Sequence, residues 1–124
     1  MSIEVQVDEL PNLVTTCGWC FVVTSGPSGA HVLSLSPTWS TSGEATFSVA
    51  SRRLSSNIEV SGAVTLVFPP FAAGELDGYS LIVDSSASIT QSDTGNLRCR
   101  HTRAVWHRPP PPAMRGSSMT WLNE

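Results

Sequence analysis

The stretch Trp-Cys-Phe-Val-Val-Thr-Ser-Gly-Pro-Ser-Gly-Ala-His-Val-Leu-Ser-Leu-Ser-Pro, residues 19–37, decides the fold class. Its first part, Trp19 to Thr24, is rich in aromatic and β-branched residues, which is typical of a strand. The segment from Ser25 to Gly29 contains two glycines and a proline and predicts a turn. From Ala30 to Pro37 the side chains alternate with a period of two, which predicts a second strand. These features together predict a β-hairpin.

Four further strands are predicted after the hairpin. Residues 45–50 alternate, and a turn at Ser42-Gly43 precedes them. The run from Val64 to Phe68 is dominated by apolar residues and predicts a buried strand, which Pro69-Pro70 ends. The last two predicted strands cover residues 79–83, with an extension towards residue 89, and residues 97–106.

Two short helices complete the pattern. Leu10, Leu13 and Val14 recur at helical spacing within residues 7–16, and Pro11 is tolerated there only in a first turn. Residues 51–61 have helical spacing again, with Ser51 as the N-cap. The order of helix, three strands, helix and three strands predicts an all-β barrel with short helices.

The composition limits the partners of the chain. Only 14% of the 124 residues are charged, well below the usual quarter or so, and we therefore expect a homodimer that hides part of its surface. The net charge is −3, with seven arginines and no lysine, so we expect neither nucleic acid nor a membrane surface as partner. The acidic segment from Met1 to Glu9 lacks the features of a signal peptide, and we expect a cytoplasmic protein.

The domain organisation is simple. Residues 1–108 form the predicted barrel domain with its short N-terminal helix, and residues 109–124 form a proline-rich C-terminal tail. The chain has no P-loop, no G-x-S-x-G and no H-E-x-x-H motif, so nothing in it indicates the enzymes that those motifs mark.

Several segments together resemble one known family. Phe21 to Thr24, Gly29 to Val32 and Pro37 to Trp39 are similar to the first hairpin of the pyridoxamine 5'-phosphate oxidase-like proteins, particularly small bacterial members of unassigned function. Residues 51–58 resemble the joint between the third strand and the helix, and the match continues through residues 64–70, 78–84 and 102–109. The resemblance implies a six-stranded split barrel of the FMN-binding type.

The resemblance also implies a cofactor and a site. FMN, or a related deazaflavin, would lie in a groove between two protomers, with its phosphate at the joint after the third strand. A helix N-terminus offers free amides to an anion there, and hydroxyl and guanidinium groups add charge-assisted bonds. Asn57 matches a common asparagine of the family, whereas Ser55 stands where a basic residue is usual. The residues assigned to cofactor binding are Ser48, Ser51, Arg52, Arg53, Asn57, Trp106 and Arg108.

Trp106 and Arg108 have two interpretations. They share one face of the last predicted strand, and Pro109 directs the chain out of the sheet, so both are expected at the rim of the groove, against the flavin or the substrate. The alternative is a packed tryptophan beneath an exposed arginine stem. In the same way, His31 and His107 are either proton donors or structural residues.

The implied function is that of a flavin-dependent oxidoreductase acting on a small molecule. The departure at Ser55 favours the alternative of a cofactor-free ligand-binding protein, or a non-redox enzyme, on the same barrel.

The cysteines offer two further hypotheses. Cys17 and Cys20 form a C-x-x-C motif, but a helix precedes it and a strand follows, the reverse of the thioredoxin arrangement. With Cys99 and His101 they could supply four zinc ligands, although the C-x-H half is not a usual finger spacing. We expect reduced structural thiols and no metal.

Overall fold

The predicted hairpin is present in the computed structural model, which describes residues 2–14, 17–41, 43–70, 78–89 and 95–108. Strands β2 (Cys20–Gly26) and β3 (Gly29–Leu35) pair antiparallel, with Gly26 opposite Gly29. Pro27 and Ser28 form the turn between them, and Gly29 has a φ of 105°, a conformation that favours glycine.

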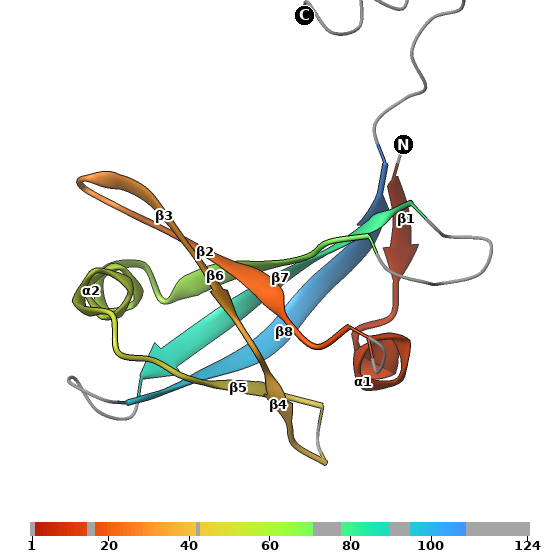
Figure 1. Cartoon of the computed structure of the whole chain (residues 1–124), viewed down its shortest axis with the longest axis horizontal. Helices are drawn as coiled ribbons and strands as arrows, with labels where there is room; N and C mark the ends of the chain where they lie inside the picture. The colour runs from red at the N-terminus through yellow and green to blue at the C-terminus, as the bar shows by residue number, and fades with distance from the viewer. Residues whose placement is uncertain (1, 15–16, 42, 71–77, 90–94, 109–124) are drawn as a thin grey trace, which may run out of the picture.

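The hairpin is one end of a single antiparallel sheet that curls on itself, with α1 and α2 towards opposite ends (Figure 1). The strand order is β3-β2-β6-β7-β8-β5-β4, and β1 pairs with β8 on the edge that faces away from β7. The remaining elements are β1 (Ser2–Val5), η1 (Val7–Glu9), α1 (Leu10–Leu13), β4 (Thr38–Trp39), β5 (Ala45–Ser48), α2 (Arg52–Ser61), β6 (Ala63–Phe68), β7 (Ser80–Ile89) and β8 (Asn96–His107).

All six predicted strands are confirmed, as β2, β3, β5, β6, β7 and β8. In the described residues the sheet has eight strands rather than six, because the short strands β1 and β4 were not predicted. The helix predicted over residues 7–16 is shorter, with η1 and α1 ending at Leu13. The helix predicted after Ser51 is confirmed with its cap, since Ser51 Oγ accepts a hydrogen bond from Leu54 N–H at 3.2 Å. The proline-rich tail lies outside the described residues.

The core fills the inner face of the curled sheet. Inward side chains alternate with outward ones along each long strand, as the period of two requires. α1 covers the core with one fully buried leucine, and so does α2. The largest fully buried residues include Leu10, Val22, Phe47, Leu54, Leu66, Phe68, Leu81, Val83 and Leu97. In the described part of the chain no helix is long and apolar enough to cross a membrane.

A buried polar contact fixes α2 to the hairpin. Asn57, only 3% exposed, donates a hydrogen bond from Nδ2 to Thr24 Oγ1 at 3.1 Å. The backbone of Gly26 lies directly against the Asn57 amide, and a Cβ atom at Gly26 would overlap it. Glycine at position 26 is therefore required by close packing.

We predict that Gly26→Ala lowers the free energy of unfolding by about 1–3 kcal/mol, because the new methyl group must displace the Asn57 amide. Gly18→Ala is the matched control, since a Cβ there meets nothing within 4 Å, and its effect should stay within about 0.5 kcal/mol. Urea denaturation measures both. Equal stability of the two variants would show that α2 can move away from the hairpin without cost.

Candidate functional site

The joint between β5 and α2 is where the resemblance places the anion. The exposed Ser48 lies at the end of β5 and lines a hollow of about 260 Å³ together with Val49, Ala50, Gly95 and Asn96. The N-cap hydroxyl of Ser51 is already engaged by Leu54 N–H. Ser48 therefore borders an open space at this joint, whereas the Ser51 side chain stabilises the helix.

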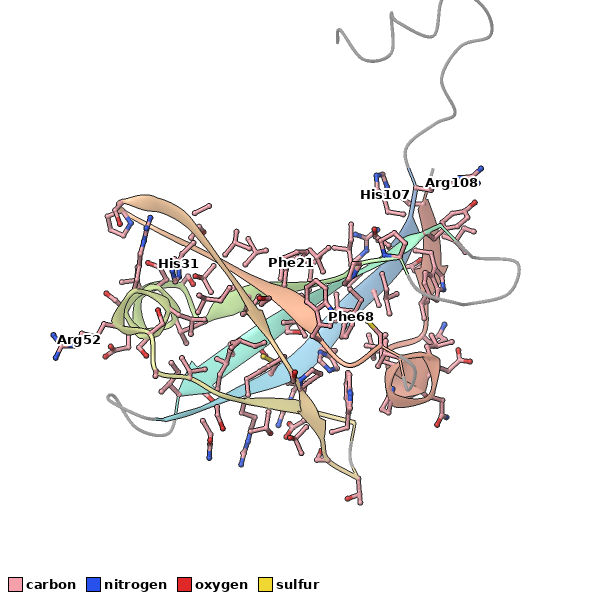
Figure 2. All side chains as sticks on the ribbon, in the orientation of Figure 1. Phe21, His31, Arg52, Phe68, His107 and Arg108 are labelled. Atoms are coloured by element: carbon pink, nitrogen blue, oxygen red, sulfur yellow. The ribbon has the colours of Figure 1, made fainter. Side chains whose placement is uncertain are left out.

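The two adjacent arginines of α2 differ in their surroundings. Arg53 donates from Nη2 to the backbone carbonyls of Ser28 and Ala30, at 3.3 Å each, and so ties α2 to the hairpin turn. Arg52 is exposed and points away from the body of the molecule (Figure 2), and no described residue pairs with it. Of the two predicted guanidinium groups, that of Arg52 is free to receive an anion.

Two further positions on α2 face inward. Ser55 is buried, and its Oγ donates to the Ser51 carbonyl at 3.0 Å. Asn57 is held by Thr24, as described above. The joint thus offers an anion the Ser48 hydroxyl, the Arg52 guanidinium and the first amides of α2, a smaller set of groups than the sequence predicted.

Trp106 and Arg108 lie at the opposite end of the sheet from α2. Trp106 is only 3% exposed and belongs to the core of the single chain, which favours the interpretation of a packed tryptophan over that of an open rim. The Arg108 guanidinium lies 4.9 Å from the centre of the Tyr79 ring, a cation–π contact. Figure 2 shows Arg52 and Arg108 at opposite sides of the molecule. One chain does not bring these two predicted groups together.

A serine–histidine pair that the sequence did not indicate lies on the inner face. Ser85 Oγ is 2.8 Å from His101 Nδ1, and the His101 Nε2 atom is buried with no partner among the described residues. Burial lowers the pKa of His101, and the nearby Glu44 carboxylate opposes this only in part. The pair has the chemistry of a nucleophile and its base. However, Ser85 is 4% exposed, which closes its hydroxyl to a substrate.

The sequence could not reveal this pair, because it depends on the register of two strands. The pairing of β7 with β8 shifts between Asp84 and Ser85, and beyond this shift Ser85 faces His101. The other two histidines are also placed by strand pairing. His31 lies opposite Thr24 in the hairpin, and His107 Nδ1 is 3.3 Å from Ser2 Oγ.

The cysteines are free thiols in the described structure. Burial raises the pKa of Cys20 to about 12, with smaller contributions from Cys99 and Cys17, and burial alone raises that of Cys99 to about 12. The Cys17 thiol, which is partly exposed, donates to the Trp19 carbonyl at 3.2 Å. No three His, Cys, Asp or Glu side chains in the described residues are arranged to hold a metal ion.

We predict a pH dependence of stability that arises from His101. Its pKa is lowered in the folded chain, so between that value and the ordinary value of 6.5 the unfolded chain binds more protons. The free energy of unfolding should therefore fall as the pH drops below about 6.5. Denaturation of the wild type and of His101→Gln at pH 7.5 and pH 5.5 separates this contribution from that of the carboxyl groups, which both proteins share. The same pH dependence in both proteins would contradict the assignment to His101.

Comparison with known proteins identifies the fold. No protein-family model matches the sequence, and no curated protein matches it. Among solved structures, the chain is similar to an FAD binding protein from Mycobacterium smegmatis (TM-score 0.63, 17% identity, 87% of this chain and 100% of that chain). It is also similar to a "putative pyridoxamine 5'-phosphate oxidase" from Corynebacterium glutamicum (0.60, 10%, 88% and 100%). A third similar structure is an F420 reductase (0.59, 16%, 75% and 93%). The chain therefore has the split-barrel fold of the pyridoxamine 5'-phosphate oxidase-like proteins.

Proposed function

We propose that the chain binds FMN, or a related deazaflavin, with the phosphate-bearing end of the cofactor at the joint between β5 and α2. The observation that carries the proposal is the open hollow at Ser48, which lies next to the N-terminus of a ten-residue helix. Arg52 adds an exposed guanidinium without an internal partner in the described structure. An anion gains there from the helix dipole, from free amides and from one charge-assisted bond.

A bound flavin would supply hydride chemistry on a small-molecule substrate, and the chain would supply binding and orientation. Ser48 and Arg52 would hold the phosphate. Arg53 would act indirectly, because its bonds to Ser28 and Ala30 fix the position of α2 relative to the hairpin. The function that the site supports is that of a flavin-dependent oxidoreductase.

The rest of the groove would come from a second copy of the chain. On the outer face of the sheet, four apolar side chains face outward in one row across β2, β6, β7 and β8, namely Phe21, Val67, Ile82 and Val105. Trp19 packs edge-to-face on Phe21 at 5.0 Å, and Val32 next to the row is 52% exposed. A continuous apolar surface of this kind is typical of an interface.

The charged residues that border this apolar row favour a second identical chain as the partner. The next row of the outer face contains Thr65, Asp84 and Arg103, and Arg103 lies 3.8 Å from Glu4. A row that carries both signs of charge can pair with a copy of itself about a two-fold axis. Such pairing is also a way to bring residues from opposite ends of the sheet, such as Arg52 and Arg108, to one ligand.

A second candidate function is the binding of a small molecule without a cofactor. It is favoured by the contacts of α2, where Arg53, Ser55 and Asn57 are all engaged internally. A phosphate at this joint would therefore contact only one guanidinium among the described residues. Each charged hydrogen bond that is missing removes about 1.5–3 kcal/mol from the binding free energy.

The visible absorption spectrum of the purified protein, followed by titration with FMN, riboflavin, FAD and a deazaflavin, tests the proposal. We expect FMN to bind, and Arg52→Gln to weaken it about tenfold, because one charged hydrogen bond is lost. Riboflavin lacks the phosphate, so the same substitution should leave its affinity unchanged. A colourless protein that ignores all of these cofactors would favour the cofactor-free alternative.

The matched control is Arg53→Gln, which removes the same charge from the neighbouring position of α2. Since this guanidinium bonds the hairpin carbonyls, the substitution should lower the thermal stability, with a smaller effect on FMN affinity than Arg52→Gln. If Arg53→Gln weakens FMN more than Arg52→Gln does, the phosphate lies on the hairpin side of α2.

A further inference from the structure

A second polar hollow lies on the outer face of the sheet, and none of its lining residues lines the hollow at Ser48. It has a volume of about 200 Å³ and lies over paired residues of β7 and β8. Ser86 lies opposite Arg100, and Ser88 lies opposite Arg98. The short serine side chains of β7 lie beside the long arginine side chains of β8. A space is therefore left above the serines, and the guanidinium groups border it.

One carboxylate orients both arginines of this hollow. Glu44, which precedes β5, lies 3.3 Å from Arg100 Nε and 3.9 Å from Arg98 Nε, one carboxylate oxygen for each arginine. Both contacts use the Nε atoms, so the terminal Nη groups keep their hydrogen-bonding capacity. The lining carries two positive charges and one negative charge, an excess of one positive charge in a chain whose net charge is −3.

The remaining polar side chains of the hollow are the hydroxyls of Ser86 and Ser88. The Ser88 hydroxyl has no partner among the described residues, whereas the Ser86 hydroxyl donates to the Arg100 carbonyl at 3.4 Å. The backbone N–H of Ala87 donates to the Gly62 carbonyl at 2.9 Å, so it is not available to a ligand. Two guanidinium groups and the Ser88 hydroxyl can thus donate to a small ligand in this space.

We propose that this hollow binds a phosphate group, free or carried by a small molecule. A guanidinium fork matches two oxygens of an oxyanion, and a tetrahedral phosphate has oxygens for two forks and for the Ser88 hydroxyl at once. A planar carboxylate has only two oxygens and can satisfy fewer of these donors. Glu44 holds the two forks in place before the ligand arrives, which reduces the entropy lost on binding.

None of the residues that line this hollow lines the hollow at Ser48, so signals of its own arginines report on it separately from the proposed flavin-binding joint. Titration of isotope-labelled protein with phosphate at low ionic strength, followed through the arginine Nε–H signals, should give saturable shifts at Arg98 and Arg100. Arg98→Gln and Arg100→Gln should each weaken phosphate about tenfold. Acetate should bind at least about tenfold more weakly than phosphate, because it leaves donors unpaired.

Arg103→Gln is the control for non-specific attraction. It removes the same charge from the same strand, but Arg103 pairs with Glu4 and does not line the hollow. Its phosphate affinity should equal that of the wild type. The proposal is overturned if the shifts do not saturate, if acetate binds as well as phosphate, or if Arg103→Gln weakens phosphate as much as the other two substitutions.

The source of the phosphate can be determined in the same experiment. Competition by FMN but not by riboflavin would show that the hollow accepts the phosphate of a flavin, and competition by neither would show that it takes a different phosphate. Both results support a phosphate site, and the titration with inorganic phosphate decides whether the site exists.

Discussion

The long strand β8 organises the sheet because both of its edges are paired. It pairs with β7 along almost its whole length, with β5 through Asn96–Cys99 and with β1 through Ala104–His107. β5 and β1 share the other edge of β8, where each pairs with a different part of the strand. The sheet curls between these two parts (Figure 1). The register shift between Asp84 and Ser85 lies between these two parts, where a bulge increases twist and bending.

This curl divides the chemistry of the chain between two faces. The inner face buries the core and, with it, Cys20, Cys99, Ser85 and Trp106, and so removes their reactive or aromatic groups from solvent. The outer face carries an apolar row at one end of β8 and the hollow of Arg98 and Arg100 at the other. The groups that can meet a ligand are therefore on the outer face and at the start of α2, whereas the Ser85 hydroxyl and two thiols are buried inside.

The sequence predicted what depends on local pattern. Alternation and turn residues identified the hairpin and the other long strands, and the Ser51 cap identified α2, because these signals are contained in a few neighbouring residues. β1 and β4 were missed because four and two residues are too few to show a period, and pairing with β8 and β5 stabilises them. The sequence could name the candidate site residues, but it could not show which of them are engaged in internal contacts and which are exposed. Arg52 and Arg53 are identical in type and adjacent, and only the position of the hairpin turn shows that one is engaged and the other exposed.

The proposed ligand groove depends on a second copy of the chain, which would cover the apolar row on the outer face. Sedimentation velocity at micromolar concentration tests it most directly. The wild type should sediment as a dimer, and the double variant Phe21→Lys with Val32→Lys as a folded monomer, because two charges then occupy the apolar surface. Val60→Lys, at an exposed valine on α2, should remain a dimer. A monomeric wild type, or a double variant that still dimerises, would contradict the account.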